Sequence, residues 1–190
     1  MKPLRALLLS AGFGTRLRPI TNKTPKCLVE VNKIPILEHW LQKLESIGVQ
    51  EVLINTHYLA TEVKKYISSR NKSNLKIHIV YEAELLGTAG TLLANRDFFS
   101  GGDVMLIHAD NFTNSSLKGM LGTYSKKPEN IELTMLIFET DNPRSCGIVS
   151  LNKSGIVKDF FEKIENPPSN IANGAIYLFD YKLINWIDKI

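Results

Sequence analysis

Short apolar runs alternate with segments of helical periodicity over the first 140 residues of the chain. Residues 6–9 form a continuous apolar run shortly before two glycines, a pattern typical of a strand buried on both faces of a parallel sheet. Apolar positions then recur at helical spacing over residues 36–47, between Pro35 at the start and Gly48 at the end. The same reasoning predicts strands at residues 51–56, 75–81, 103–109 and 131–138, and helices at residues 59–67 and 117–124.

The strand at residues 75–81 alternates apolar and polar positions, which indicates an edge of the sheet. Thr88 follows a turn at Gly87 and is placed to cap a helix that runs towards Phe98. Repeated strand–helix–strand units predict an α/β fold with a mainly parallel sheet and right-handed crossovers.

Beyond residue 140 the pattern becomes strand-like, without intervening helices. Residues 147–151 and 156–163 flank the turn-forming sequence NKSG, and residues 172–179 form a third run. Such hairpin-like elements could form one wall of a ligand pocket. The final sequence, YKLINWIDKI, returns to helical spacing.

The amino-acid composition limits the kinds of molecule that the protein is expected to bind. The chain has 190 residues, enough for one ordinary domain, with a formal net charge of +4 and a sequence pI near 9.0. The lysines are scattered, which favours a small phosphorylated ligand over nucleic acid. Two cysteines and the lack of a long apolar run indicate a reduced, cytoplasmic protein with no membrane partner. The pattern is also compatible with a homo-oligomer.

The stretch LLLSAGFGTRLRPITNKTPK, residues 7–26, is the strongest candidate for chemistry. Gly12 and Gly14 allow backbone N–H groups to converge on a phosphate after a buried strand. Arg16 and Lys26 add two cations to the same loop. A lone Gly-x-Gly is usually only a turn, so the assignment depends on the rest of the chain.

Six sequence signals occur in a fixed order along the chain. They are GFGTRLRP followed by TPK, LLGTAGTL, the pair AD at residues 109–110, CGI, FEK and NGAIYLFD. Together they resemble the sugar-1-phosphate nucleotidylyltransferases, especially the mannose and heptose 1-phosphate guanylyltransferases and the glucose-1-phosphate thymidylyltransferases. The resemblance implies a Rossmann-like three-layer α/β/α fold with a central mixed, mainly parallel sheet. It implies a transferase of nucleotide-sugar biosynthesis, a step that supplies precursors of cell-surface polysaccharides.

The implied reaction joins a nucleoside triphosphate to a sugar 1-phosphate and releases pyrophosphate. The attacking phosphate oxygen has a second pKa of about 6 and needs no general base, so cations should dominate the site. The resemblance places Arg16 on the triphosphate and Lys26 between the α-phosphate and the incoming sugar phosphate. Asp110, at the end of a buried strand, would hold Mg²⁺, although a helix cap is the simpler alternative for this residue.

The resemblance also distributes the binding residues along the chain. In a single domain, residues 1–140 would bind the nucleotide and residues 141–190 the sugar phosphate. The nucleotide candidates are Ala11, Gly12, Gly14, Thr15, Glu82, Leu86, Gly87 and Thr88. The sugar-phosphate candidates are Gly147, Glu162, Lys163, Asn173 and Tyr177. Tyr177 lies in a strand-like run and could equally be a core residue. A carboxylate such as Glu82 or Glu84 could accept two N–H groups from guanine or the single imide N–H of uracil or thymine, so these residues leave the base open. The resemblance of RLRP, INTHYL and LGTAGTL to the guanylyltransferases of the family favours GTP, with dTTP or UTP as alternatives.

Two departures from the family pattern are visible. Ala109 stands where the family usually has glycine, with little consequence for the neighbouring carboxylate. Family members also continue beyond this point to an aspartate that supplies a second metal ligand. Trp186 and Asp188 have the right Trp-x-Asp spacing but lack the Gly-Thr that follows it, so they are expected to lie in a helix.

Two other functions compete with the leading one. Cytidylyl transfer to a phosphorylated alcohol such as phosphocholine would suit the same fold. A catalytically incomplete module that binds nucleotide sugars is suggested by the lack of the C-terminal segment. A dinucleotide oxidoreductase is disfavoured because Leu17 stands at the third glycine position of G-x-G-x-x-G.

Overall fold

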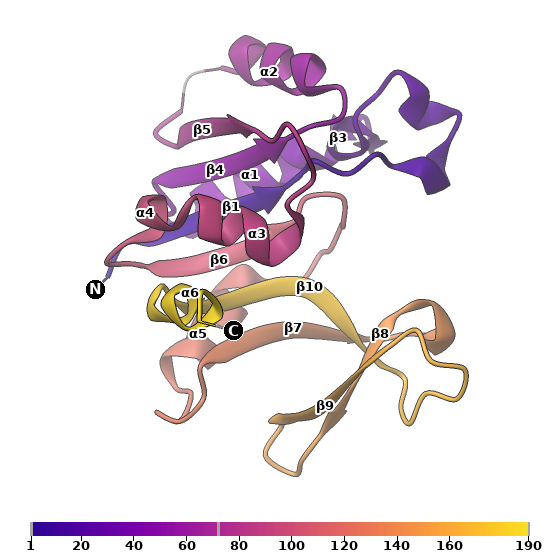
Figure 1. Cartoon of the computed structure of the whole chain (residues 1–190), viewed down its shortest axis with the longest axis vertical. Helices are drawn as coiled ribbons and strands as arrows, with labels where there is room; N and C mark the ends of the chain where they lie inside the picture. The colour runs from indigo at the N-terminus through magenta and orange to yellow at the C-terminus, as the bar shows by residue number, and fades with distance from the viewer. Residues whose placement is uncertain (1, 72, 190) are drawn as a thin grey trace. The chain divides into compact units, whose positions relative to one another are not determined.

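The computed structural model of the protein describes residues 2–71 and 73–189 (Figure 1). These residues form two compact units, the first comprising Met1–Thr134 and Tyr177–Ile190 and the second Met135–Ile176. The division does not test the assignment of residues 1–140 to the nucleotide and 141–190 to the sugar phosphate, which stays a prediction.

A parallel sheet forms the centre of the first unit. In spatial order its strands are β5 (Lys76–Tyr81), β4 (Glu51–Thr56), β1 (Leu4–Leu9) and β6 (Asp103–His108). β1 pairs in parallel with both neighbours, so that Leu9 lies opposite Asn55 of β4 and His108 of β6. The carboxyl ends of these three strands therefore share one edge of the sheet, where ligands bind in open α/β folds.

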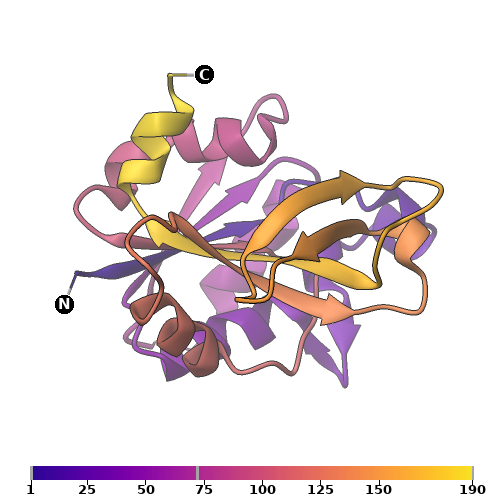
Figure 2. The ribbon, with the colours of Figure 1, turned by 90° about the horizontal axis from the view of Figure 1, so that it is seen from below.

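Helices cover both faces of this sheet, as Figure 2 shows. One face carries α1 (Ile36–Ser46) and α5 (Leu117–Ser125), and the other carries α3 (Gly87–Ala94) and α6 (Lys182–Ile187). α2 (Ala60–Ser69) is tied to α1 because the Tyr66 hydroxyl donates to Glu38 Oε2 over 3.0 Å. α4 (Arg96–Phe99) follows α3 after a break at Asn95. No helix in the part of the chain that the structure describes has the length and hydrophobicity needed to cross a bilayer.

The apolar positions predicted from periodicity form the core of the first unit. β1, β4 and β6 contribute side chains that are almost fully buried, including Leu7, Leu53 and Leu106. α4 and α6 pack against them through Phe99 and Ile184. The match arises because a strand covered on both faces must be apolar on both faces.

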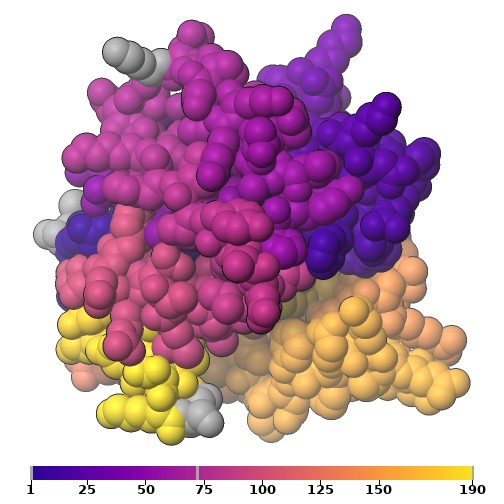
Figure 3. Space-filling model, turned by 45° about the horizontal axis from the view of Figure 1, so that its top comes forward, coloured from indigo at the N-terminus to yellow at the C-terminus, as the bar shows by residue number. Residues whose placement is uncertain are grey.

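Short elements shape the loop between β1 and α1. Three 3₁₀ turns and a small antiparallel hairpin occur there: η1 (Thr15–Leu17), η2 (Ile20–Asn22), η3 (Lys26–Leu28), β2 (Glu30–Val31) and β3 (Ile34–Pro35). Figure 3 shows this loop, in indigo, at the surface beside the purple segment that leads into α2. Tyr58, from that segment, fastens the loop by donating to Thr21 O over 3.0 Å.

The second unit is antiparallel. It contains most of β7 (Leu133–Glu139), the turn η4 (Pro143–Ser145), β8 (Gly147–Leu151), β9 (Val157–Glu162) and the first part of β10 (Ile171–Asp180). β8 and β9 form a hairpin whose NKSG turn is closed by Asn152, which accepts from the N–H groups of Ser154 and Ile156. The last residues of β10 return to the first unit, which makes the whole sheet mixed.

The predicted elements are confirmed in kind and in order, and the strand at residues 75–81 is the edge strand β5. The prediction for Thr88 is wrong. α3 begins at Gly87 with Leu86 as its N-cap and no side-chain cap, so Thr88 lies inside the helix. The expected helix towards Phe98 is also interrupted, because the Asn95 side chain donates to Thr91 O over 2.8 Å where α3 ends.

Candidate active site

The opening loop leaves the sheet at the carboxyl end of β1 and turns sharply at Gly14. Gly14 has φ of 65°, and a Cβ atom there would lie 2.9 Å from Thr21 Cγ2. The Thr21 hydroxyl donates to Gly14 O over 2.7 Å and so braces the turn from within. Glycine is required at this position by both conformation and space.

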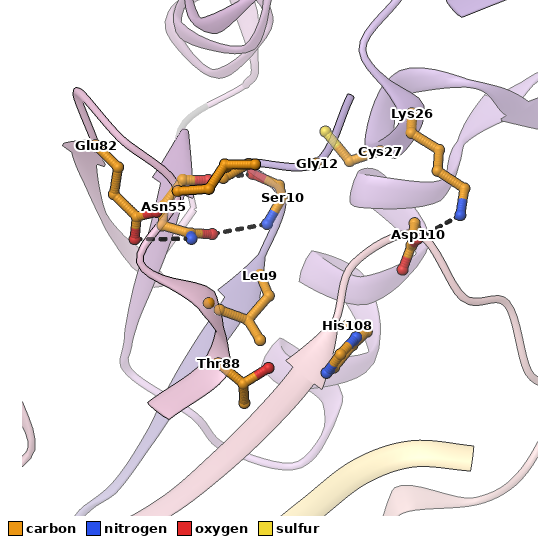
Figure 4. A pocket seen from close by; sticks show the side chains of 13 residues that line it. Leu9, Ser10, Gly12, Lys26, Cys27, Asn55, Glu82, Thr88, His108 and Asp110 are labelled. Atoms are coloured by element: carbon orange, nitrogen blue, oxygen red, sulfur yellow. Dashed lines mark hydrogen bonds and ion pairs between the residues drawn. The ribbon is translucent and has the colours of Figure 1, made fainter. Parts of the chain in front are cut away.

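A pocket of about 230 Å³ opens at the edge where β1, β4 and β6 end (Figure 4). Seven of the residues that line it were predicted: Ala11, Gly12, Lys26, Glu82, Gly87, Thr88 and Asp110. The remaining lining residues were not: Leu9, Ser10, Cys27, Asn55, Leu85 and His108. These seven predicted residues therefore line one cavity, although they come from four separate stretches of the chain.

Lys26 and Asp110 form an ion pair at the mouth of this pocket. Lys26 Nζ donates to Asp110 Oδ2, and the two side chains are 21% and 31% exposed. The predicted catalytic lysine and the predicted metal ligand thus neutralise each other although 84 residues separate them in the sequence. Trp40 of α1 supports this corner because its Nε1–H donates to Asn111 O over 2.9 Å.

Glu82 and Asn55 form a buried polar network on the other side of the pocket (Figure 4). The Glu82 carboxylate accepts from Asn55 Nδ2 over 3.0 Å, from the Thr91 hydroxyl over 2.5 Å and from Leu86 N over 3.4 Å. Asn55 was missed by the sequence analysis. The sequence did contain a clue to its role, since Asn55 is an amide within the predicted buried strand EVLINT. A buried polar side chain requires hydrogen-bond partners.

Two further pocket residues have shifted pKa values. Burial lowers the pKa of His108, with Lys26 acting in the same direction and Asp110 opposing it. Burial raises the pKa of the Cys27 thiol to about 12, which keeps the thiol neutral. Both cysteines are free.

The other nucleotide candidates in the first unit do not line the pocket. Gly14, Thr15 and Arg16 lie further along the opening loop, and Leu86 is the exposed N-cap of α3. The Arg16 side chain is exposed and has no ion pair within residues 2–71 and 73–189.

Three sugar-phosphate candidates meet in the second unit. Gly147 pairs with Glu162 across the hairpin, and a Cβ at Gly147 would lie 2.6 Å from Phe160 Cζ. Lys163 Nζ lies 3.4 Å from Glu162 Oε1, and its backbone has φ of 49°. Such a conformation costs a non-glycine residue roughly 1–3 kcal/mol and is often found at functional sites.

The remaining two candidates differ from each other in setting. Asn173 Oδ1 accepts from Ala175 N over 2.8 Å within β10. Tyr177 packs against the core of the first unit, which is the alternative reading given for it above. Sugar-phosphate binding by either residue stays a prediction.

Asp110 is the one residue that the sequence analysis predicted as a metal ligand. Among the described residues, no group of three or more His, Cys, Asp or Glu side chains could enclose a metal ion. Trp186 lies in α6 and Asp188 caps it, as expected, and Asp188 pairs with Arg96 over 2.8 Å. Asp110 alone suits an ion that takes one or two carboxylates and fills its remaining positions with phosphate oxygens and water.

Comparison with known proteins places this site in a family. The sequence profile described as nucleotidyl transferase matches residues 5–189, which include both units. The chain belongs to the nucleotidyl transferase family. A member named mannose-1-phosphate guanylyltransferase catalytic subunit beta, from Drosophila pseudoobscura pseudoobscura, is 31% identical over 97% of this chain and 50% of its own length. Glucose-1-phosphate thymidylyltransferase from Streptomyces griseus is 31% identical over 93% of this chain and 49% of its own.

Solved structures support the fold of this nucleotidyl transferase domain. A protein from Bacillus anthracis, assigned as a glucose-1-phosphate thymidylyltransferase and solved with sucrose, superposes with a TM-score of 0.89. It is 23% identical, and the match covers 98% of this chain and 75% of the other. The expected Rossmann-like three-layer fold with a mixed, mainly parallel sheet is confirmed. The chain spans about half the length of the curated relatives it matches.

Proposed function

We propose that this domain transfers a nucleotidyl group from a nucleoside triphosphate to a sugar 1-phosphate. The observation that carries the proposal is the convergence of the opening loop, Lys26 and Asp110 on one pocket at the carboxyl edge of the sheet. Family membership and the guanylyl- and thymidylyltransferase relatives support the same reaction class.

The chemistry is an in-line displacement at the α-phosphorus. An oxygen of the sugar 1-phosphate forms a new bond to this phosphorus while the bond to the oxygen that bridges the α- and β-phosphates breaks. Pyrophosphate leaves with the electron pair of that bond, and no proton has to be removed from the nucleophile. Lys26 can stabilise the negative charge on the reacting phosphates, and Arg16 can hold the leaving pyrophosphate through its planar guanidinium.

Asp110 would hold Mg²⁺ in this reaction. When bound, the ion supplies Lewis-acid stabilisation of phosphate charge. In the structure Asp110 Oδ2 accepts the Lys26 ammonium, so Lys26 would compete with the ion for this carboxylate.

Sugar phosphate binding would depend on the second unit. The Lys163 ammonium suits the phosphate, Glu162 suits the sugar hydroxyls, and the open backbone at Gly147 allows close approach of the sugar. Lys163 has a left-handed backbone conformation, which is unfavourable for a residue with a side chain. Such a conformation is retained at functional sites, which supports a role for the Lys163 side chain.

The base would be read between Ala11 and the segment from Glu82 to Gly87. Three donors already occupy the Glu82 carboxylate, which has about four lone-pair sites, so about one remains for a base N–H. The exposed Glu84 could accept a second N–H from guanine. One free site on Glu82 would suit the imide N–H of uracil or thymine equally well, so the preference for GTP rests on the guanylyltransferase relatives, with dTTP and UTP as alternatives.

Pyrophosphate release should be measured over a grid of GTP, dTTP, UTP and CTP against mannose, glucose and heptose 1-phosphates and phosphocholine. Release with a purine or pyrimidine nucleotide and a sugar 1-phosphate supports the proposal. Nucleotide binding without release from any pair would contradict it and favour a binding module. Release only with CTP and phosphocholine would favour the other transferase class.

Lys163→Ala tests the assignment of the second unit. It should raise the KM for the sugar 1-phosphate about tenfold or more, because a charge-assisted contact is lost, and change the KM for the nucleotide little. Lys158→Ala, which removes an exposed lysine from strand β9 just before Lys163, is the matched control. A larger effect on the nucleotide than on the sugar phosphate would contradict the role of Lys163.

A further inference from the structure

The side chain of Asn55 continues the hydrogen bonding of the sheet at the point where β1 ends. The parallel pairing of β1 with β4 stops at Leu9, opposite Asn55. The next amide, Ser10 N–H, donates to Asn55 Oδ1 over 2.7 Å, and the Ser10 hydroxyl donates to the Asn55 carbonyl. The first residue of the opening loop is therefore fastened to β4 by two bonds after the regular ladder has ended.

Glu82 determines which way the Asn55 amide points. An amide side chain has one accepting end and one donating end, whereas a carboxylate only accepts. Asn55 Nδ2 donates to Glu82 Oε1 over 3.0 Å and lies 3.3 Å from Thr91 Oγ1 (Figure 4). The Asn55 side-chain oxygen must consequently face Ser10. The Glu82 carboxylate therefore determines which groups donate and which accept along this series of hydrogen bonds.

The network is buried, so each bond in it matters. Ser10, Asn55, Glu82 and Thr91 are 8%, 3%, 6% and 0% exposed. In the described part of the chain Glu82 has no ion pair, and the three groups that donate to its carboxylate are neutral. A buried carboxylate without a cation is costly compared with an apolar side chain of similar volume, so stability alone does not account for it. Its position beside the pocket points to a functional reason.

The network connects two walls of the pocket. Ser10, Ala11 and Gly12 lie on one wall, and the segment of Glu82 and Gly87 lies on another. Leu86 N–H donates to Glu82 Oε2, so the same carboxylate also holds the turn before α3. The distance between the two walls is thus set by hydrogen bonds to one amide and one carboxylate.

We propose that Asn55 is a positioning residue that fixes the backbone of residues 10–12 for nucleotide binding, with its amide oriented by Glu82. The inference rests on the proposed function in taking the ligand to be a nucleotide. Asn55 itself acts through Ser10, because its oxygen and its backbone carbonyl are both used by that residue.

Asn55→Asp is the direct test, because it keeps the shape of the side chain and replaces the Nδ2 donor to Glu82 with an acceptor oxygen. The new carboxylate would face Glu82 at hydrogen-bond distance, and like charges at that distance repel strongly. We expect hydrogen exchange of the Ser10 amide, measured by NMR without nucleotide, to accelerate about tenfold or more. The nucleotide Kd should rise by about tenfold, while the KM for the sugar 1-phosphate should stay within about twofold.

The double variant Asn55→Asp/Glu82→Gln should restore the network with reversed polarity. The new amide at position 82 can donate to the new carboxylate at position 55, which still accepts from Ser10 N–H. Ser10 protection should return to within about threefold of the parent. A merely structural role for either residue would predict additive damage instead.

Thr56→Val is the matched control. Thr56 is the next residue of β4, is 1% exposed, and donates to Val80 O over 3.0 Å outside the network. This variant should lower stability without changing Ser10 exchange beyond the global effect. If Asn55→Asp does not fold, Thr91→Val removes one donor to Glu82 and should accelerate Ser10 exchange about threefold.

Unchanged Ser10 exchange in a folded Asn55→Asp or Thr91→Val variant would overturn the inference. So would a folded double variant that fails to restore protection. Failure of the proposed function would look different: the parent protein would release no pyrophosphate with any substrate pair, whereas Ser10 exchange would still respond to Asn55→Asp.

Discussion

Replacing Lys26 by methionine should tighten the binding of a divalent cation to the free protein, even though it should abolish turnover. Lys26 Nζ donates to Asp110 Oδ2, so the ammonium occupies the carboxylate that a cation would need. Lys26→Met removes this competing charge and keeps most of the apolar stem. The lysine is expected to act as an internal counter-ion that is exchanged for metal when the nucleotide arrives.

The size of the effect follows from the exposure of the pair. Hydrogen bonds between charged groups contribute about 1.5–3 kcal/mol when buried, and exposed ion pairs contribute about 0–1 kcal/mol. The two side chains are 21% and 31% exposed, which places this pair between these limits, at about 1–1.5 kcal/mol. Since about 1.4 kcal/mol corresponds to a factor of ten, the metal Kd should fall about five- to tenfold.

The assay is a titration with Mn²⁺, observed by electron paramagnetic resonance in the absence of nucleotide. Lys23→Met, which removes an exposed charge from the same loop, controls for the change in net charge and should alter the Kd less than about twofold. Asp110→Asn should weaken binding in either background. Unchanged or weaker Mn²⁺ binding in a folded Lys26→Met variant would refute the counter-ion role.

Three further predictions concern Gly14 in the opening loop, the two cysteine thiols, and the hydrogen bond from Trp40 to the residue after Asp110. Gly14→Ala should raise the nucleotide Kd and destabilise the fold by about 1–2 kcal/mol, because the new Cβ meets Thr21 and φ is positive; unchanged chemical denaturation would contradict this. Cys27, with a pKa of about 12, should resist iodoacetamide at pH 8 in the folded protein while the partly exposed Cys146 reacts, and equal labelling rates by mass spectrometry would disprove the burial argument. Trp40→Phe should cost about 2–3 kcal/mol of unfolding free energy by denaturant titration, since both volume and the bond to Asn111 O are lost; a change below about 0.5 kcal/mol would contradict the role of that bond.

The order of strands and helices could be predicted because the relevant signals are local. The strand at residues 51–56 and the strand at 103–109 are apolar on both faces, and α1 has an apolar face between Pro35 and Gly48. The Thr88 cap failed for an equally physical reason. α3 begins at Gly87, two residues before a helix capped by Thr88 would begin, and its N-cap residue Leu86 has no side chain that could cap it.

The candidate site was predicted in its residue types and only partly in its geometry. The glycines of the opening loop and Asp110 were singled out because they follow buried strands, whereas the role of Lys26 was implied by the resemblance to the family. That Lys26 pairs with Asp110 could not be predicted, because it depends on where η3 places the lysine relative to the end of β6. The structure leaves the roles of Arg16 and Lys163 as predictions.

The sequence by itself therefore determined the alternation of elements and the position of the glycine-containing opening loop after a buried strand, whereas phosphate binding by that loop stays a prediction. Tertiary structure decided which side chains satisfy one another. In the sequence nothing distinguishes Asn55 and Glu82 from other amides and carboxylates. The register of β1 on β4 places the Ser10 amide next to Asn55 Oδ1, while Asn55 Nδ2 faces Glu82. Hydrogen bonds require atoms to lie within about 3 Å of each other, and the sequence encodes that proximity only through the packing of the whole sheet.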